Sequence, residues 1–207
     1  MEFKIDKLPQ DFNTSIQFME RRVHSIIEQT EGELAWILNY PAIYTCGAHE
    51  NKNDLLDNTK FPIFKTNRGG KYTYHGPGQK IIYLMINLNQ RNKDVRAFVT
   101  LIENIILNIL ERFGINGVLD HKHHGIFIRK DDGKLYKIAS IGIKFKKWVS
   151  YHGFSFNLNP DLEHYSGINP CGLSNQNVTS LSDIGIEVDN KTFDNIAIEE
   201  INNIFDK

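Results

Sequence analysis

The spacing of apolar residues predicts helices in three parts of this chain. Residues 13–29 and 192–205 each repeat apolar side chains at helical intervals, with charged residues between them. Residues 95–113 form the strongest of the three patterns, because their apolar positions make one wide face that ends at Gly114. The candidate N-cap residues of the first helix are Asn13, Thr14 and Ser15.

Shorter apolar stretches bounded by turn residues predict β-strands. They cover residues 34–38, 42–46, 61–66, 80–88, 125–130, 134–145 and 149–159. The Asp-Asp-Gly turn at 131–133 joins two of them into a hairpin. Helices and hairpins are intermixed, which is typical of an α+β fold with helices packed on a mixed, mostly antiparallel sheet. Because the sequence has no internal repeat or Pro/Gly/Ser-rich linker, residues 1–207 are predicted to form a single domain.

Charge balance and cysteine content narrow the class of protein. The 207 residues include 24 basic and 25 acidic side chains, and the net charge of −1 argues against a dedicated nucleic-acid binder. Two cysteines cannot form a disulfide framework, and this number suits a reducing compartment. The first residues lack the apolar core of a secretory signal, and the longest apolar run, residues 81–88, is too short to span a bilayer. We therefore expect a cytoplasmic protein with no nucleic-acid or membrane partner.

A glycine-rich stretch between two predicted strands is the first candidate functional site. Residues 68–79 read R-G-G-K-Y-T-Y-H-G-P-G-Q and combine glycines with Arg68, Thr73 and His75. Glycine allows the backbone to adopt positive φ and lets a ligand approach closely. The stretch lacks the Gly-Lys-Ser/Thr ending of a phosphate-binding P-loop. Composition alone leaves two interpretations open, a tight surface turn and a ligand-binding loop.

Cys171 and Lys137 are candidates for a nucleophile and its partner. Cys171 lies in the loop sequence G-I-N-P-C-G, where Gly172 has no side chain to shield the thiol. A buried, inert thiol is an equal alternative. Lys137 lies in an apolar segment, and strand alternation favours the interpretation that it faces water like Lys144 and Lys146. The alternative is that Lys137 is a cation that lowers a thiol pKa and moves protons.

Three other features with reactive side chains have simpler interpretations. Cys46 follows an apolar strand and is predicted to be a packing residue. His152 stands beside a glycine in a strand and could be a core histidine or a site residue. Residues 121–124 read H-K-H-H, but they lack carboxylates or cysteines in register. They are interpreted as a solvated loop, and no metal site is predicted.

Several motifs, taken together and in order, resemble the lipoate–protein ligase B family. They are P-A-I-Y-T-C-G (41–47), R-G-G-K-Y-T-Y-H-G-P-G-Q-K-I-I-Y (68–83), K-I-A-S-I-G and H-G within 137–159, G-I-N-P-C-G (167–172) and V-T-S-L (178–181). The resemblance covers most of the chain, from Trp36 to Gly185. It implies the fold of the biotin/lipoate protein ligases.

The resemblance also implies roles for individual residues. Cys171 matches the family's catalytic cysteine, and Lys137 matches its catalytic lysine. The family's substrate-binding stretches match three sets of residues in this sequence. They are Arg68, Gly69, Gly70, Lys71, Tyr72, Thr73, Tyr74 and His75, then Ser140, Ile141 and Gly142, and then His152, Gly153, Phe154 and Ser155. The two tyrosines of the first set are candidates for the lining of an acyl channel.

The implied reaction transfers an octanoyl group from octanoyl-acyl carrier protein to a lysine of a lipoyl domain. Such domains occur in the E2 subunits of 2-oxo-acid dehydrogenase complexes and in the glycine cleavage H protein. A thioester donor is already activated, so a cysteine nucleophile can carry out the transfer in two steps without ATP or another cofactor. The alternatives are an ATP-dependent lipoate or biotin ligase, an octanoyl/lipoyl amidotransferase between carrier proteins, and a non-catalytic carrier-binding module.

Overall fold

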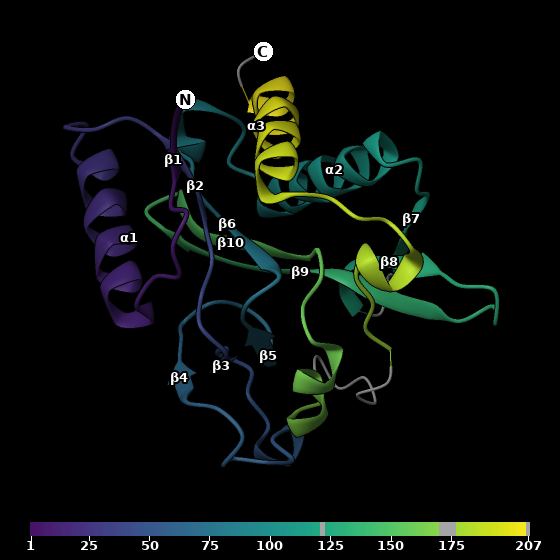
Figure 1. Cartoon of the computed structure of the whole chain (residues 1–207). Coiled ribbons are helices and arrows are strands. Elements are labelled where there is room, and N and C mark those ends of the chain that lie inside the picture. Colours follow the sequence, from purple (N-terminus) through teal and green to yellow (C-terminus); the bar gives the residue numbers. More distant parts are fainter. Residues whose placement is uncertain (121–122, 170–176, 206–207) are drawn as a thin grey trace.

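A seven-stranded mixed sheet forms the centre of the fold (Figure 1). The computed structural model describes residues 1–120, 123–169 and 177–205. The strand order is β1-β2-β6-β10-β9-β8-β7. The strands are β1 (Glu2–Ile5), β2 (Leu34–Leu38), β6 (Gln79–Met85), β7 (Gly117–Asp120), β8 (His123–Arg129), β9 (Leu135–Lys146) and β10 (Val149–Asn157). Only the β1–β2 pairing within this sheet is parallel among the described strands, which confirms the predicted mixed, mostly antiparallel α+β fold.

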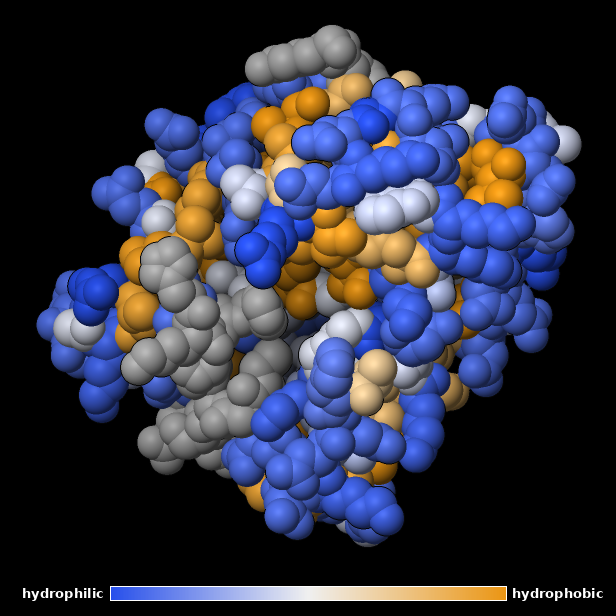
Figure 2. Space-filling view, turned by 180° about the vertical axis from the view of Figure 1, so that it is seen from behind, coloured by the Kyte–Doolittle hydropathy of each residue, from blue (hydrophilic) through white to orange (hydrophobic). Residues whose placement is uncertain are grey.

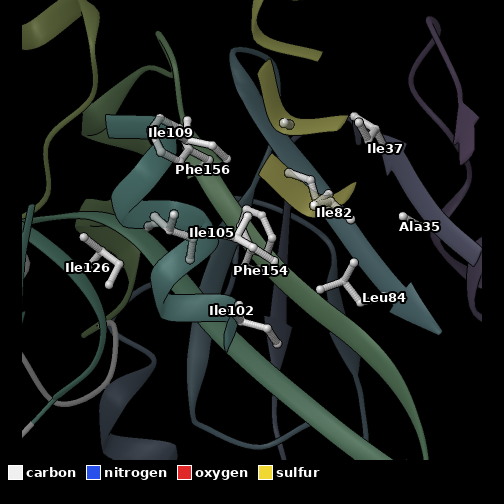
Figure 3. Close-up of a cluster of buried hydrophobic side chains, with 14 of the residues drawn as sticks. Ala35, Ile37, Ile82, Leu84, Ile102, Ile105, Ile109, Ile126, Phe154 and Phe156 are labelled. Carbon is white, nitrogen blue, oxygen red and sulfur yellow. The ribbon is translucent and has the colours of Figure 1, made fainter. Parts of the chain in front are cut away.

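Helices cover both faces of this sheet. The helices α2 (Val95–Arg112) and α3 (Asn190–Phe205) pack on one face, and α1 (Phe12–Ile27) packs on the other. Isoleucines of α2 such as Ile105 and Ile109 lie against Phe154 and Phe156 of β10 (Figure 3). Strands β6 and β10 are buried along their whole length because apolar layers lie on both sides of them.

Aspartates begin the first two helices. The predicted N-cap candidates of α1 are wrong, because the N-cap is Asp11, whose backbone is extended and whose carboxylate accepts a hydrogen bond from the Thr14 amide at 2.8 Å. Asp94 caps α2 in the same way. The predicted end of α2 is confirmed by Gly114, which follows the helix with φ +73°.

A smaller three-stranded sheet lies beside the main one (Figure 1). Its order is β4 (Ile63–Lys65), β3 (Ile43–Cys46) and β5 (Tyr72–His75). Its aromatic residues, including Tyr44 and Tyr74, pack against Tyr165 of the 3-10 helix η3 (Leu162–Gly167). The short 3-10 helices η1 (Lys52–Asp54), η2 (Leu88–Gln90) and η5 (Ser182–Ile184) complete the described elements.

A buried ion pair connects α3 to the central strand β6. The Lys80 ammonium lies 2.7 Å from the Asp194 carboxylate, and both side chains are almost entirely buried. Desolvation raises the pKa of Asp194, while the lysine acts in the opposite direction. Each charge depends on the other, because an isolated buried charge is strongly unfavourable.

Polar residues cover most of the face shown in Figure 2, where apolar residues reach the surface in separate patches. Within the parts of the chain that the structure describes, no helix is both long and apolar enough to pass through a bilayer.

Candidate active site

A cavity lies between the glycine-rich stretch and strands β6, β9 and β10. The empty space between these elements, part of it open to solvent, is about 550 Å³. The glycine-rich stretch contributes Arg68, Gly70, Tyr72, Thr73 and His75. Strands β9 and β10 contribute Ser140, Ile141, Gly142, His152, Gly153, Phe154 and Ser155. The cavity therefore brings together residues of all three predicted substrate-binding sets.

Three residues of the predicted sets do not line this cavity. They are Gly69, Lys71 and Tyr74. Alternate residues of a strand point to opposite faces, so Tyr74 faces the small-sheet cluster, where its hydroxyl lies 2.8 Å from His164 Nδ1. Lys71 points elsewhere and forms an ion pair with Asp54 at 3.0 Å. Tyr72 lines the cavity, but it lies on the same face of β5 as Tyr74, and its hydroxyl donates to Glu50 Oε2 at 3.3 Å.

Arg68 fixes the conformation of the glycine-rich stretch. Its guanidinium donates to the Thr45 hydroxyl and to the main-chain oxygens of Gly69 and Lys71, each at 2.9 Å. The Gly69 amide in turn donates to the Ile143 oxygen of β9 at 3.2 Å. These bonds hold the stretch against β9 and make one wall of the cavity.

Glycines let the walls of the cavity approach one another. A Cβ atom at Gly153 would lie 1.9 Å from the Ile82 oxygen of β6, and one at Gly142 would lie 3.0 Å from Arg68 Cδ. Neither position can carry a side chain without a shift of its neighbours. The H-G and I-G motif positions are therefore explained by close packing.

His75 is a neutral histidine in a fixed tautomer. Gln79 Nε2 donates to Asn157 and Tyr165. The Oε1 atom of Gln79 is therefore the acceptor of a hydrogen bond from the Nδ1–H group of His75, at a distance of 2.7 Å. Burial lowers the pKa of His75 to about 4, and the Arg68 charge acts in the same direction. With the proton on Nδ1, Nε2 is the ring nitrogen that can accept a hydrogen bond.

His152 has a left-handed backbone within a strand. Its φ is +61°, a conformation that is uncommon for residues other than glycine. The ring stacks on its neighbour Tyr151 and lies edge-on to Tyr83, and Nε2 lies 3.2 Å from Asn67 Oδ1. Burial lowers its pKa to about 3, with further lowering by Arg68 and His75. Local strain of this kind concentrates at functional sites.

Thr73 supplies a hydroxyl with unused hydrogen-bonding capacity. Its side chain lines the cavity and is 7% exposed, and its Oγ1 has no partner within the described part of the chain. A buried hydroxyl without a partner is unfavourable. A polar group of a ligand in the cavity would satisfy it.

Lys137 is buried, and the interpretation that it faces water is wrong. Only 2% of the residue is exposed, and its Nζ lies 5.3 Å from the centre of the Phe127 ring. Gly125, with φ +132°, leaves room for the lysine, since a Cβ there would lie 3.0 Å from Lys137 Cε. Lysines are rarely buried at this level without a specific reason.

A register shift places Lys137 on the same face of β9 as Lys144 and Lys146, so the burial of Lys137 comes from what covers that face locally. Ile126 pairs with Ala139, whereas the next residue, Phe127, pairs with Lys137, so Ile138 is extra on β9. An extra residue reverses the alternation of faces on the two sides of the bulge. Lys144 and Lys146, beyond the bulge, are exposed as predicted.

Cys171 lies outside the described residues, so its predicted role remains a prediction. The chain is described up to Asn169, whose amide donates to the Asp54 oxygen at 2.7 Å. It is described again from Asn177, whose oxygen accepts from the Lys137 amide at 2.8 Å. The second cysteine, Cys46, is buried, which confirms its assignment to packing, and burial raises its pKa to about 11.

No metal-binding group emerges from the residues whose side chains are described, where no three His, Cys, Asp or Glu side chains converge. Residues 121 and 122 of the H-K-H-H segment lie outside the description. The cavity lining combines hydroxyls, neutral imidazoles and apolar walls with the Arg68 guanidinium, which is hydrogen-bonded to Thr45, Gly69 and Lys71.

Sequence reasoning missed several residues of the site. The further cavity-lining residues are Phe12, Thr45, Thr66, Ile81 and Tyr83. Gln79, which orients His75, ended a recognised motif but was not selected. Thr45, Ile81 and Tyr83 also lie within motifs that carry the resemblance, whereas no pattern marks Phe12, at the start of α1, or Thr66, directly after β4.

Comparison with known proteins agrees with this geometry. The model of the lipoyl protein ligase A/B catalytic domain matches residues 11–202. The chain is 46% identical to an octanoyltransferase of Neorickettsia sennetsu, covering 91% of this chain and 90% of that protein. It is 43% identical to an octanoyltransferase of Wolbachia pipientis, covering 99% of both.

Solved structures with low identity share the fold. A structure of the bi-partite lipoate protein ligase of Thermoplasma acidophilum gives a TM-score of 0.76 at 13% identity, over 100% of this chain and 84% of that chain. Biotin protein ligase of Aquifex aeolicus gives 0.54 at 13% identity, over 98% and 68%. The fold expected from the resemblance is therefore confirmed.

Family match and fold together identify an acyltransferase built on the lipoate/biotin ligase scaffold. The chain belongs to the lipoyl protein ligase A/B family and, within it, to the octanoyltransferases, the acyltransferases of protein lipoylation.

Proposed function

We propose that the chain takes an octanoyl group from octanoyl-acyl carrier protein and transfers it to a lysine of lipoyl domains in the cytoplasm. The acceptors would be the E2 subunits of 2-oxo-acid dehydrogenase complexes and the glycine cleavage H protein. The observation that supports this most is the cavity itself, which combines apolar walls with the unpaired Thr73 hydroxyl. An acyl chain would occupy the apolar part, and its carbonyl oxygen would accept from the hydroxyl.

The proposed chemistry proceeds in two steps through Cys171. The thiolate attacks the donor carbonyl, the carbon–sulfur bond to the carrier breaks, and the carrier thiol leaves with a proton. The acceptor amine then attacks the enzyme thioester, and the amide bond forms as the Cys171 thiolate leaves. Lys137 would stabilise the thiolate as an ammonium and, after losing its proton to the departing carrier thiolate, accept one from the amine.

Two neutral histidines suit this scheme. His75 and His152 carry no positive charge near neutral pH, because burial lowers both pKa values far below 7. They would therefore orient groups by hydrogen bonding and would leave the thiolate-stabilising charge to Lys137. The Arg68 charge is engaged in holding the glycine-rich stretch.

The test is intact-protein mass spectrometry after mixing with octanoyl-acyl carrier protein in the absence of ATP. We expect an octanoyl mass increment that maps to Cys171 and disappears when apo lipoyl domain is added. Cys46→Ser is the matched control and should keep the increment, whereas Cys171→Ser should lose it. Acyl transfer that requires ATP and free acid would support the ligase alternative, and an octanoyl-lipoyl-domain donor that outperforms the carrier protein would support the amidotransferase.

A further inference from the structure

A buried hydrogen-bond network leads from the cavity toward strand β9. Gln79 Nε2 donates to Asn157 Oδ1 and to the Tyr165 hydroxyl, both at 2.9 Å, and that hydroxyl donates to Asn157 Oδ1 at 3.1 Å. On one side, Gln79 accepts from the cavity residue His75. On the other side, Asn157 Nδ2 donates to the Thr179 main-chain oxygen at 2.9 Å.

The segment that Asn157 binds is the backbone partner of Lys137. The Lys137 amide donates to the Asn177 oxygen at 2.8 Å, and its oxygen accepts from the Thr179 amide at 2.9 Å. Strand β8 occupies the other edge of β9 at this point, through Phe127. Residues 177–179 therefore pair with β9 on the side that β10 occupies up to its end at Asn157.

All four linking residues are buried, so water cannot replace a lost bond. Gln79, Asn157, Tyr165 and Thr179 are each no more than 3% exposed. If the Asn157 amide were removed, the Thr179 oxygen would lose its side-chain donor in a site without solvent. Residues 177–179 would then shift to regain a partner, and Lys137 would shift with them.

We propose that Asn157 is a positioning residue of the transferase, which sets Lys137 relative to the acyl cavity by holding residues 177–179. This inference rests on the proposed function, in which Lys137 acts at the reacting centre. Among the described residues, Asn157 does not line the cavity, and its side chain bonds Gln79, Tyr165 and the Thr179 oxygen. Its contribution passes through the Thr179 carbonyl and the Lys137 backbone.

The experiment compares Asn157→Leu with Ser150→Ala in the full-length protein. Leucine has the same number and branching of side-chain heavy atoms as asparagine but cannot donate to Thr179. Ser150 is the matched control, because it lies on the same strand, is fully buried, and hydrogen-bonds the Leu84 oxygen and the Ile86 amide away from the cavity. Both variants are followed by thermal unfolding and by steady-state transfer from octanoyl-acyl carrier protein.

We expect Asn157→Leu to lower kcat about tenfold or more while KM for the donor stays within about twofold, because small misplacements of reacting groups reduce rates strongly. The pH profile for Cys171 alkylation by iodoacetamide should move to higher pH in the same variant, because the ammonium is displaced. Ser150→Ala should lose thermal stability with kcat and the alkylation profile unchanged.

A wild-type kcat in folded Asn157→Leu would overturn the proposal, as would equal loss of kcat in Ser150→Ala. If Asn157→Leu does not fold, Tyr165→Phe removes only the hydroxyl that orients Asn157 and should lower kcat less, in the same direction. An unchanged kcat there would also count against the proposal. If the wild-type protein forms no octanoyl adduct, the proposed function fails first, and Asn157 then has no reacting centre to position.

Discussion

The two buried histidines predict a loss of stability in mildly acidic solution. An unfolded histidine has a pKa near 6.5, whereas burial lowers the pKa to about 4 for His75 and to about 3 for His152. Between pH 6.5 and pH 4 the unfolded chain binds protons at these positions and the folded chain does not. The free energy of unfolding is therefore fully present above pH 6.5 and falls as the pH is lowered through this range.

The size of the effect follows from the linkage between protonation and folding. One pKa unit corresponds to about 1.4 kcal/mol, so lowering the pH from 7 to 5 should cost about 2 kcal/mol for each histidine, or about 4 kcal/mol together. That is a large part of the ~5–15 kcal/mol by which a typical domain is stable. Carboxylates with ordinary pKa values titrate below pH 5 and contribute little to the difference, and the raised pKa of Asp194 acts in the opposite direction to the histidines.

Urea unfolding at pH 7 and pH 5 measures this quantity. For each variant, the free energy of unfolding at pH 5 is subtracted from that at pH 7. A destabilisation that is the same at both pH values then cancels. His152→Asn, which tolerates positive φ, should reduce the pH-dependent loss by about half. Ser150→Ala changes a buried group that does not titrate. Its free energy of unfolding should therefore fall between pH 7 and pH 5 by the same amount as that of the wild-type protein. If His152→Asn and the wild-type protein lose the same stability between these pH values, the assignment of a buried, neutral imidazole is wrong.

Four substitutions test the remaining assignments. Cys171→Ser should abolish octanoyl transfer with the circular dichroism spectrum unchanged, and near-normal turnover would exclude the covalent mechanism. Lys137→Ala should raise the pKa of Cys171 and slow its alkylation at neutral pH, and an identical pH profile would remove Lys137 from that role. Thr73→Val should raise KM for the octanoyl donor without lowering the unfolding free energy, since the replaced hydroxyl has no partner among the described residues. Gly153→Ala should cost about 1–3 kcal/mol of stability through its clash with the Ile82 oxygen, whereas Gly32→Ala, with open space around it, should cost little in the same denaturation assay.

Local patterns predicted the elements whose own residues determine them. The three helices and the long strands β9 and β10 follow directly from apolar spacing. Strands β1, β5 and β7 were missed; each has four residues, and β1 and β5 gain their hydrogen bonds from β2 and β3, which are not their neighbours in sequence. Strand β5 was also hidden within the glycine-rich stretch, where glycine suggests a turn.

Motif order, and not the chemistry of single residues, selected most of the residues that line the cavity. Lys137 shows the limit, because its burial depends on the parts of the folded chain that cover its face of β9, which leave no signal in its own sequence. The pairing of Gln79 with Asn157 depends on the β6–β10 register in the same way. Such contacts are decided by tertiary structure and are invisible to periodicity.

The ion pair between Lys80 and Asp194 has a consequence for the order of events during synthesis. Strand β6 is made early, but its buried ammonium lacks this counter-charge until residue 194 has left the ribosome. We therefore expect the sheet around β6 to remain loosely packed on nascent chains that end before α3, since a lone buried charge is strongly unfavourable. The acyl cavity, whose wall includes β6, would then be completed only when α3 docks, so the enzyme would acquire its substrate pocket late in translation.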